Sequence, residues 1–146
     1  MTLTKTPICD FGKKAESFEL KSIENKIVSL NDAKGKNGTL IMFICNHCPY
    51  VKAVINDIVN DSNILKKEGI NFIAIMSNDT KNYPDDSFEN MIKFAKENHF
   101  NFPYLIDETQ EIAKAYDAVC TPDFFGYNNN LELQYRGRIR ELKELK

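Results

Sequence analysis

Two cysteines, Cys45 and Cys48, directly follow an apolar run at residues 39–44. After them, apolar residues recur at helical spacing from Val51 onward, so the sequence predicts a strand, a Cys-x-x-Cys turn and a helix in succession. The N-terminus of a helix carries unpaired backbone N–H groups and the positive end of the helix dipole, both of which favour an anion. Because the thiolate is the reactive form of cysteine, this arrangement predicts a site for thiol–disulfide exchange.

The composition is that of a single globular domain, which we take to span residues 1–146. The chain is 42% hydrophobic and 27% charged, with a net charge of −2, and it has no basic stripe that would bind nucleic acid. Residues 1–10 are polar, and no run of about 18 apolar residues occurs, so we expect no membrane partner and a cytoplasmic location. In a reducing compartment, four cysteines indicate redox or metal chemistry rather than a structural disulfide framework; they are Cys9, Cys45, Cys48 and Cys120.

The remaining elements are predicted from hydrophobic periodicity and turn residues. They are a hairpin at residues 18–30, a strand at 70–76, a helix at 88–98, a strand at 103–106, a helix at 108–118 and a hairpin at 123–136. We expect positive φ angles among the three asparagines that join the last two strands, residues 128–130. The strand–helix–strand order predicts parallel pairing, which the last hairpin turns into a mixed sheet.

Four segments carry a longer signature: residues 43–52 around the cysteines, 82–87, 102–110 and 120–125. Together they resemble the thioredoxin superfamily and, within it, a peroxiredoxin-like branch of the alkyl hydroperoxide reductase/thiol-specific antioxidant (AhpC/TSA) family. The resemblance implies an α/β, thioredoxin-like fold: a central mixed sheet flanked by helices, here with an N-terminal β-hairpin extension. Members of that family continue past the last strand into a helix and tail, so we expect the C-terminal helix or tail to be truncated here.

Roles for individual residues follow from the chemistry of dithiol exchange and from the resemblance. Cys45 is expected to be the more exposed, attacking thiol and Cys48 the resolving one, with His47 favouring the thiolate as a nearby cation or hydrogen-bond donor. Thr121 and Pro122 correspond to the loop that carries a cis-proline facing the active cysteines, so they are expected to bind substrate.

Further assignments concern other residues of the four signature segments. Cys120 is either a third thiol near the site or a small buried residue at the start of a strand. We expect Asp85 and Asp86 to be solvated, and Tyr50 and Phe124 to border an exposed groove.

These observations predict a thiol–disulfide oxidoreductase with a Cys-Asn-His-Cys motif that serves in antioxidant redox homeostasis. It would act on protein or small-molecule disulfides and be regenerated by a cellular thiol reductant, with no bound cofactor or metal. One alternative is a thiol-dependent peroxidase in which Cys48 is oxidised to a sulfenic acid and Cys45 resolves it. Another is a copper- or zinc-binding module that uses Cys45, Cys48 and either His47 or Cys120.

Overall fold

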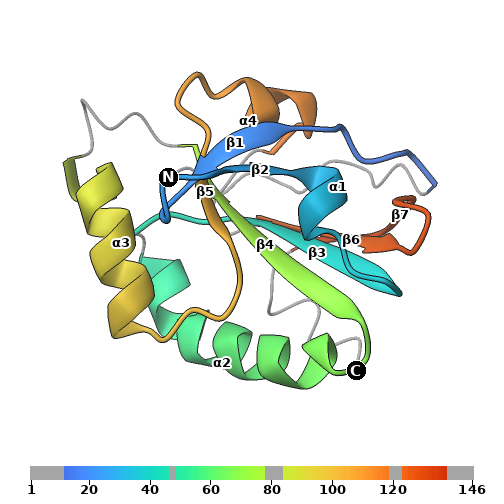
Figure 1. Ribbon diagram of the computed structural model, residues 1–146, viewed down its shortest axis with the longest axis horizontal. Coiled ribbons are helices and arrows are strands. Elements are labelled where there is room, and N and C mark those ends of the chain that lie inside the picture. Colours follow the sequence, from blue (N-terminus) through green and yellow to red (C-terminus); the bar gives the residue numbers. More distant parts are fainter. Residues whose placement is uncertain (1–11, 47–48, 78–83, 119–122, 138–146) are drawn as a thin grey trace.

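The computed structural model describes residues 12–46, 49–77, 84–118 and 123–137 (Figure 1). Its strands are β1 (Glu19–Ser22), β2 (Ile27–Ser29), β3 (Gly38–Phe43), β4 (Ile70–Met76), β5 (Tyr104–Ile106), β6 (Asp123–Asn128) and β7 (Leu133–Gly137). Its helices are α1 (Leu30–Ala33), α2 (Pro49–Lys66), the 3₁₀ turn η1 (Pro84–Asp86), α3 (Phe88–Glu97) and α4 (Glu111–Ala115). The predicted α/β architecture with a mixed sheet is confirmed.

The strands form one seven-stranded sheet in the order β2-β1-β5-β4-β3-β6-β7. The central strand β3 pairs in parallel with β4 and antiparallel with β6, and Phe43 at the end of β3 lies opposite Asp123 at the start of β6. The chain therefore leaves β3 toward Cys45 at the same end of the sheet where it enters β6. This register places the start of β6 at the edge of the sheet from which the chain leads to Cys45.

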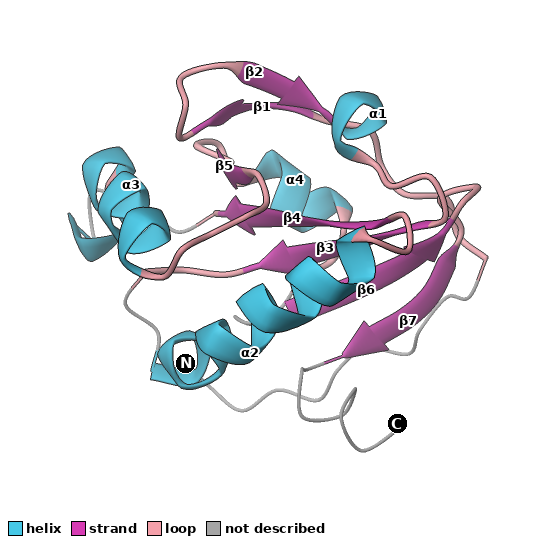
Figure 2. Ribbon diagram, turned by 60° about the horizontal axis from the view of Figure 1, so that its bottom comes forward, coloured by secondary structure: helices cyan, strands magenta, loops and turns pink. Residues whose placement is uncertain are grey.

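All six residues of β3 are buried, as expected for a strand covered on both faces. Leu40 and Met42 point into one core, whereas Ile41 and Phe43 point into the other. Helices α2 and α3 cover the first face, while α4 and α1 lie on the second (Figures 1 and 2). This alternation explains the continuous apolar run in the sequence, because neither face of the strand meets water.

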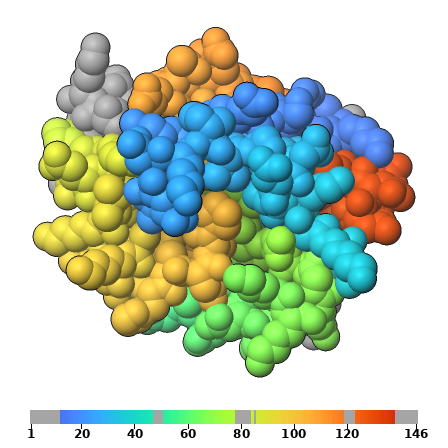
Figure 3. Space-filling view, in the orientation of Figure 1, coloured from blue at the N-terminus to red at the C-terminus, as the bar shows by residue number. Residues whose placement is uncertain are grey.

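The predicted N-terminal hairpin forms from β1 and β2, and Asn25 in its turn has a φ of 62°. β1 also pairs antiparallel with β5 through Lys21 and Ile106, so the hairpin extends the central sheet. In the space-filling view the hairpin, in blue, packs directly against the cyan and orange parts of the chain (Figure 3). The expected extension is thus part of the main sheet.

The turn between β6 and β7 differs from the prediction. The positive φ, 60°, falls on Leu131 rather than on an asparagine. The side-chain oxygen of Asn128 accepts hydrogen bonds from the backbone N–H groups of Asn130 and Glu132, each at 3.0 Å. Asn128 therefore shapes the turn through its side chain rather than through an unusual backbone conformation.

Across the described ranges, no helix is both long and apolar enough to cross a membrane.

Candidate active site

Cys45 lies two residues beyond the end of β3, and α2 begins at Pro49. The backbone N–H of Ile44 still donates to the carbonyl oxygen of Ile75 at 3.0 Å, so strand-like pairing continues almost to the cysteine. The predicted order of strand, cysteine motif and helix is confirmed. His47 and Cys48 lie outside the described residues, and their assigned roles stay predictions.

Cys45 is only 1% exposed. The exposed attacking thiol expected from the sequence is not present in this conformation, because the Cys45 side chain is buried. A substrate sulfur can contact its Sγ atom only after neighbouring atoms are displaced. Any mechanism that begins at Cys45 therefore includes a local opening of the site.

Asn46 is held from two directions. Its backbone N–H donates to Oδ1 of Asp86 at 2.7 Å, and its side-chain oxygen accepts from the Tyr104 hydroxyl at 2.8 Å. The Asn46 residue is 6% exposed, and both partners are fully buried. A hydrogen bond of this kind usually contributes about 1 kcal/mol to stability. The first residue between the two cysteines is thus turned into the protein and fixed there.

The position of Asp86 corrects a prediction, because this residue is 0% exposed rather than solvated. Asp86 ends the η1 turn, directly before Ser87, whose hydroxyl caps α3 by accepting from the N–H of Asn90 at 3.2 Å. The Asn90 side chain in turn donates to the carbonyl of Pro84 at 3.1 Å. The helix cap therefore fixes the turn that carries the carboxylate to Asn46, and this hydrogen bond compensates for the carboxylate's burial.

Tyr104 closes the buried network from β5. Burial raises the pKa of Tyr104 well above its usual value of 10.0, and the charges of Asp86 and Cys45 raise it further. The phenol therefore stays protonated over the whole physiological range and can always donate to Asn46. The same effect shows that the carboxylate, the thiol and the phenol lie close enough to interact electrostatically.

A second prediction is corrected at Phe124. This side chain is 0% exposed and packs in the core on the α2 side of the sheet, so it does not border a surface groove. The side chains of Tyr50 and Asp85 lie outside the described part of the chain, as do Cys120, Thr121 and Pro122. Those assignments stay predictions.

Neither Asp86 nor Tyr104 was singled out as a site residue from the sequence. Asp86 directly precedes Ser87, the N-cap of α3, and a serine cap of this kind can be recognised in the sequence. No local sequence pattern indicates that Asp86 contacts Asn46. No three His, Cys, Asp or Glu side chains gather into a potential metal site within the described ranges. The described part of the site is thus a buried thiol beside a carboxylate, an amide and a phenol.

Two solved structures share this architecture. The chain is 47% identical to an uncharacterized conserved protein from Geobacillus kaustophilus, whose structure superposes with a TM-score of 0.91 over 94% of this chain and 74% of that one. The thioredoxin domain of a thiol-disulfide oxidoreductase from Bacteroides vulgatus superposes with a TM-score of 0.76 at 16% identity, over 94% of this chain and 99% of that one. The protein therefore has a thioredoxin-like fold, as predicted.

The family follows from the sequence matches. The model of the AhpC/TSA family matches residues 11–142, and the chain belongs to that family. It is also 30% identical, over 125 residues, to the thiol-disulfide oxidoreductase ResA of Bacillus thuringiensis, and this match covers 84% of this chain and 66% of the relative. The match to ResA of Bacillus cereus covers 62% of that protein, so the chain spans less than two thirds of these curated relatives.

Proposed function

We propose that the protein is a thiol–disulfide oxidoreductase whose reactive groups are Cys45 and Cys48. The observation that carries the proposal is the placement of Cys45 between the end of β3 and the start of α2, with Asn46 held by Asp86 and Tyr104. The similarity to two ResA proteins named as thiol-disulfide oxidoreductases supports it. We further propose a cytoplasmic role in redox homeostasis, with a cellular thiol as reductant.

The exchange proceeds in two balanced steps. The Cys45 thiolate attacks one sulfur of a substrate disulfide, which forms a mixed disulfide and releases the other substrate sulfur as a thiolate. The Cys48 thiolate then attacks Sγ of Cys45, which forms the Cys45–Cys48 disulfide and releases the second substrate thiolate. Two electrons pass from the dithiol to the substrate, and two thiol equivalents from the cellular reductant restore the starting state.

A peroxidase is the second candidate, and the AhpC/TSA family match favours it. In that reaction the Cys48 thiolate attacks one peroxide oxygen and becomes a sulfenic acid, while the O–O bond breaks and the other oxygen takes up a proton and leaves as water or an alcohol. Cys45 then displaces water to form the same disulfide. The burial of Cys45 is compatible with this resolving role, because a resolving thiol need not meet the external substrate first.

One preparation decides between the two reactions. Insulin disulfide reduction and hydrogen peroxide consumption are measured side by side with dithiothreitol as reductant, in the wild type and in Cys45→Ser, Cys48→Ser and Cys9→Ser. Insulin reduction that requires Cys45, is unaffected by Cys9→Ser and comes without peroxide turnover supports the oxidoreductase. Peroxide consumption that is lost in Cys48→Ser but partly retained in Cys45→Ser would overturn it in favour of the peroxidase.

A further inference from the structure

The Tyr104 phenol is fixed in the fold independently of the cysteine motif. Tyr104 pairs with Ala74 of β4, and its main-chain carbonyl accepts from the backbone N–H of Ile23 at 3.0 Å. The residue is 0% exposed, and its ring packs against that of Phe100 with centroids 5.3 Å apart. Because strand pairing holds the backbone and core packing holds the ring, the hydroxyl keeps its place when the motif moves.

Cys45 lies in the same core as Tyr104, on the α2 side of the sheet. It is 1% exposed there, so contact with an external disulfide requires the thiol to leave this core. Asn46 is the next residue in the chain, and a planar peptide bond joins the two. Cys45 therefore cannot move outward without carrying Asn46 with it.

Two hydrogen bonds oppose that movement. The Asn46 N–H donates to Oδ1 of Asp86 at 2.7 Å, and the Asn46 side-chain oxygen accepts from the Tyr104 hydroxyl at 2.8 Å. Both are buried, where a hydrogen bond is electrostatically stronger than in water. They reach Asn46 from η1 and from β5, so the residue beside the thiol is held by two separate elements.

We propose that Tyr104 is a positioning residue that keeps Cys45 closed through Asn46. In the closed conformation the hydroxyl holds Asn46 and the thiol is buried. In a minor open conformation Asn46 has left both partners and the thiol can meet a disulfide, so Tyr104 sets the population that reacts. The inference rests on the proposed function for its consequence in the reaction, whereas the closed conformation is a property of the fold.

Alkylation tests the closed conformation without any activity. In a chain that keeps Cys45 as its only cysteine, Tyr104→Phe retains the ring and removes the hydroxyl. Native labelling by a maleimide is expected to become about fivefold faster, the factor that corresponds to the loss of one net hydrogen bond. A labelling rate equal to that of the parent chain would overturn the inference.

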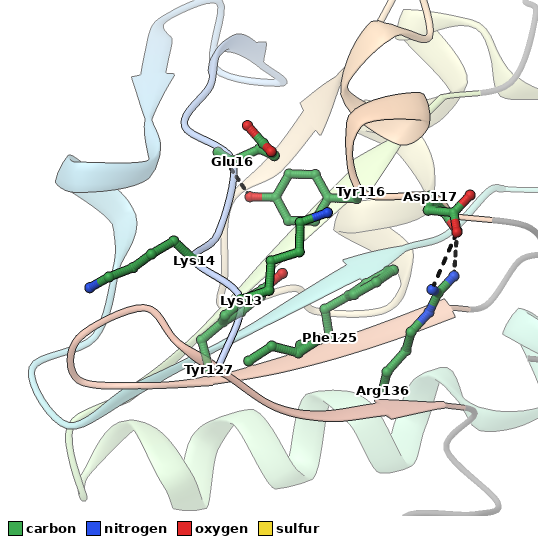
Figure 4. Close-up of a pocket in the computed structure, with 9 residues that line it drawn as sticks. Lys13, Lys14, Glu16, Tyr116, Asp117, Phe125, Tyr127 and Arg136 are labelled. Atoms are coloured by element: carbon green, nitrogen blue, oxygen red, sulfur yellow. Dashed lines mark hydrogen bonds and ion pairs between the residues drawn. The ribbon is translucent and has the colours of Figure 1, made fainter. Parts of the chain in front are cut away.

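Tyr116→Phe is the matched control. Tyr116 is also buried, and its hydroxyl donates to the main-chain carbonyl of Glu16 (Figure 4), but it lies in the core on the other face of the sheet. Its loss is expected to leave the labelling rate of Cys45 within about twofold of the parent chain, because the two sites share no partner. Equal acceleration by Tyr104→Phe and Tyr116→Phe would mean that Tyr104 acts only through overall stability, and the inference would fail.

Asn46→Ala shows whether the effect of Tyr104 passes through Asn46. This variant removes the side-chain oxygen that accepts the hydroxyl bond. The double variant with Tyr104→Phe is then expected to label no faster than the faster of the two single variants. Accelerations that multiply would show two independent contributions and would contradict the role assigned to Tyr104.

Urea separates local opening from unfolding. Release of Asn46 exposes little surface, so the labelling rate of Cys45 in Tyr104→Phe is expected to rise far less steeply with urea than the unfolded fraction does. A labelling rate that follows the unfolding curve would mean that the thiol becomes accessible only in the unfolded chain. That result would refute a closed conformation controlled by Tyr104.

Kinetics test the consequence for the reaction. Because the apparent rate scales with the fraction of open protein, Tyr104→Phe is expected to raise kcat/KM for insulin reduction about fivefold, while Tyr116→Phe leaves it unchanged. An unchanged kcat/KM in Tyr104→Phe would overturn its role in the reaction. If the wild type does not reduce insulin, the proposed function fails, and the labelling experiment still decides whether Tyr104 keeps Cys45 closed.

Discussion

Asp86 accepts a hydrogen bond from the backbone N–H of Asn46 at 2.7 Å, across 40 residues of sequence. The contact joins the turn before α3 to the residue that follows Cys45. It makes the conformation of the cysteine motif depend on a helix cap elsewhere in the chain.

Asp86→Ala removes the acceptor of this hydrogen bond and leaves the Asn46 N–H buried. We expect the free energy of unfolding to fall by about 2 kcal/mol, since an unsatisfied buried donor costs about 1–3 kcal/mol. Urea unfolding of the oxidised protein measures the effect. Asp86→Asn keeps a carbonyl acceptor of the same shape and is expected to lose less than half as much.

Glu89→Ala is the control for this change, because Glu89 is an exposed acid in the first turn of α3. Its effect is expected to stay within about 0.5 kcal/mol, as for most surface substitutions. If Asp86→Ala were no less stable than Glu89→Ala, the hydrogen bond to Asn46 would not contribute to the fold.

Alkaline pH tests the buried phenol of Tyr104. Its pKa is raised in the folded protein, chiefly by burial, so between about pH 10 and the folded-state pKa the unfolded chain binds fewer protons than the native one. The stabilisation is complete below the unfolded-state pKa and is lost as the pH rises, by about 1.4 kcal/mol per pH unit for this group. Tyr104→Phe is expected to flatten the decline by that amount.

Free energies of unfolding from urea titrations measure this difference, which amounts to about 1.4 kcal/mol in total between about pH 9 and about pH 11, because the unfolded phenol is only half ionised at about pH 10. Burial also raises the pKa of Tyr116, so Tyr116→Phe should flatten the curve to a similar degree. A Tyr104→Phe curve parallel to that of the wild type would show that the Tyr104 phenol ionises equally easily in both states.

Gly35 lies where two backbone segments meet at the start of β3. A Cβ atom at this position would come within 2.6 Å of three backbone atoms, which belong to Gly38, Gly69 and Asn71. Because backbone atoms cannot rotate away as a side chain can, Gly35→Ala is expected to destabilise the protein by about 3 kcal/mol.

Gly126→Ala serves as the comparison, because its nearest neighbour would be the Tyr135 side chain at 3.4 Å, an ordinary contact. Its effect is expected to be within about 1 kcal/mol of zero. Equal thermal midpoints for the two variants would mean that the segments around Gly35 separate readily.

The sequence predicts most elements of the fold because their signals are local. The apolar run that becomes β4 and the stripe that becomes α3 are read directly from spacing, and the cysteine motif falls between strand and helix as expected. The pairing of β1 with β5 was not predicted, because the alternation of a hairpin shows which face is buried but not which strand it joins.

The missed part of the site depends on contacts between distant segments. From the sequence, Asp86 is predicted to be a solvated acid. The prediction fails because its partner is the backbone N–H of Asn46, and a backbone group has no sequence signature. The sequence predicts that Tyr104 belongs to a short strand. Nothing in the neighbouring sequence indicates that its hydroxyl donates a hydrogen bond to Asn46.

The burial of Cys45 gives a direct test of which thiol meets the substrate. The first variant has Cys9, Cys48 and Cys120 replaced by serine and is treated with a bulky maleimide. Alkylation of Cys45 is expected to be at least about tenfold slower in the native protein than in urea, because the reagent must reach the thiolate before it can react. The matched variant keeps only Cys48. Faster native labelling of Cys48 than of Cys45 would favour Cys48 as the first nucleophile, as the peroxidase requires. Native labelling of Cys45 as fast as in urea would contradict its burial and return the attacking role to it.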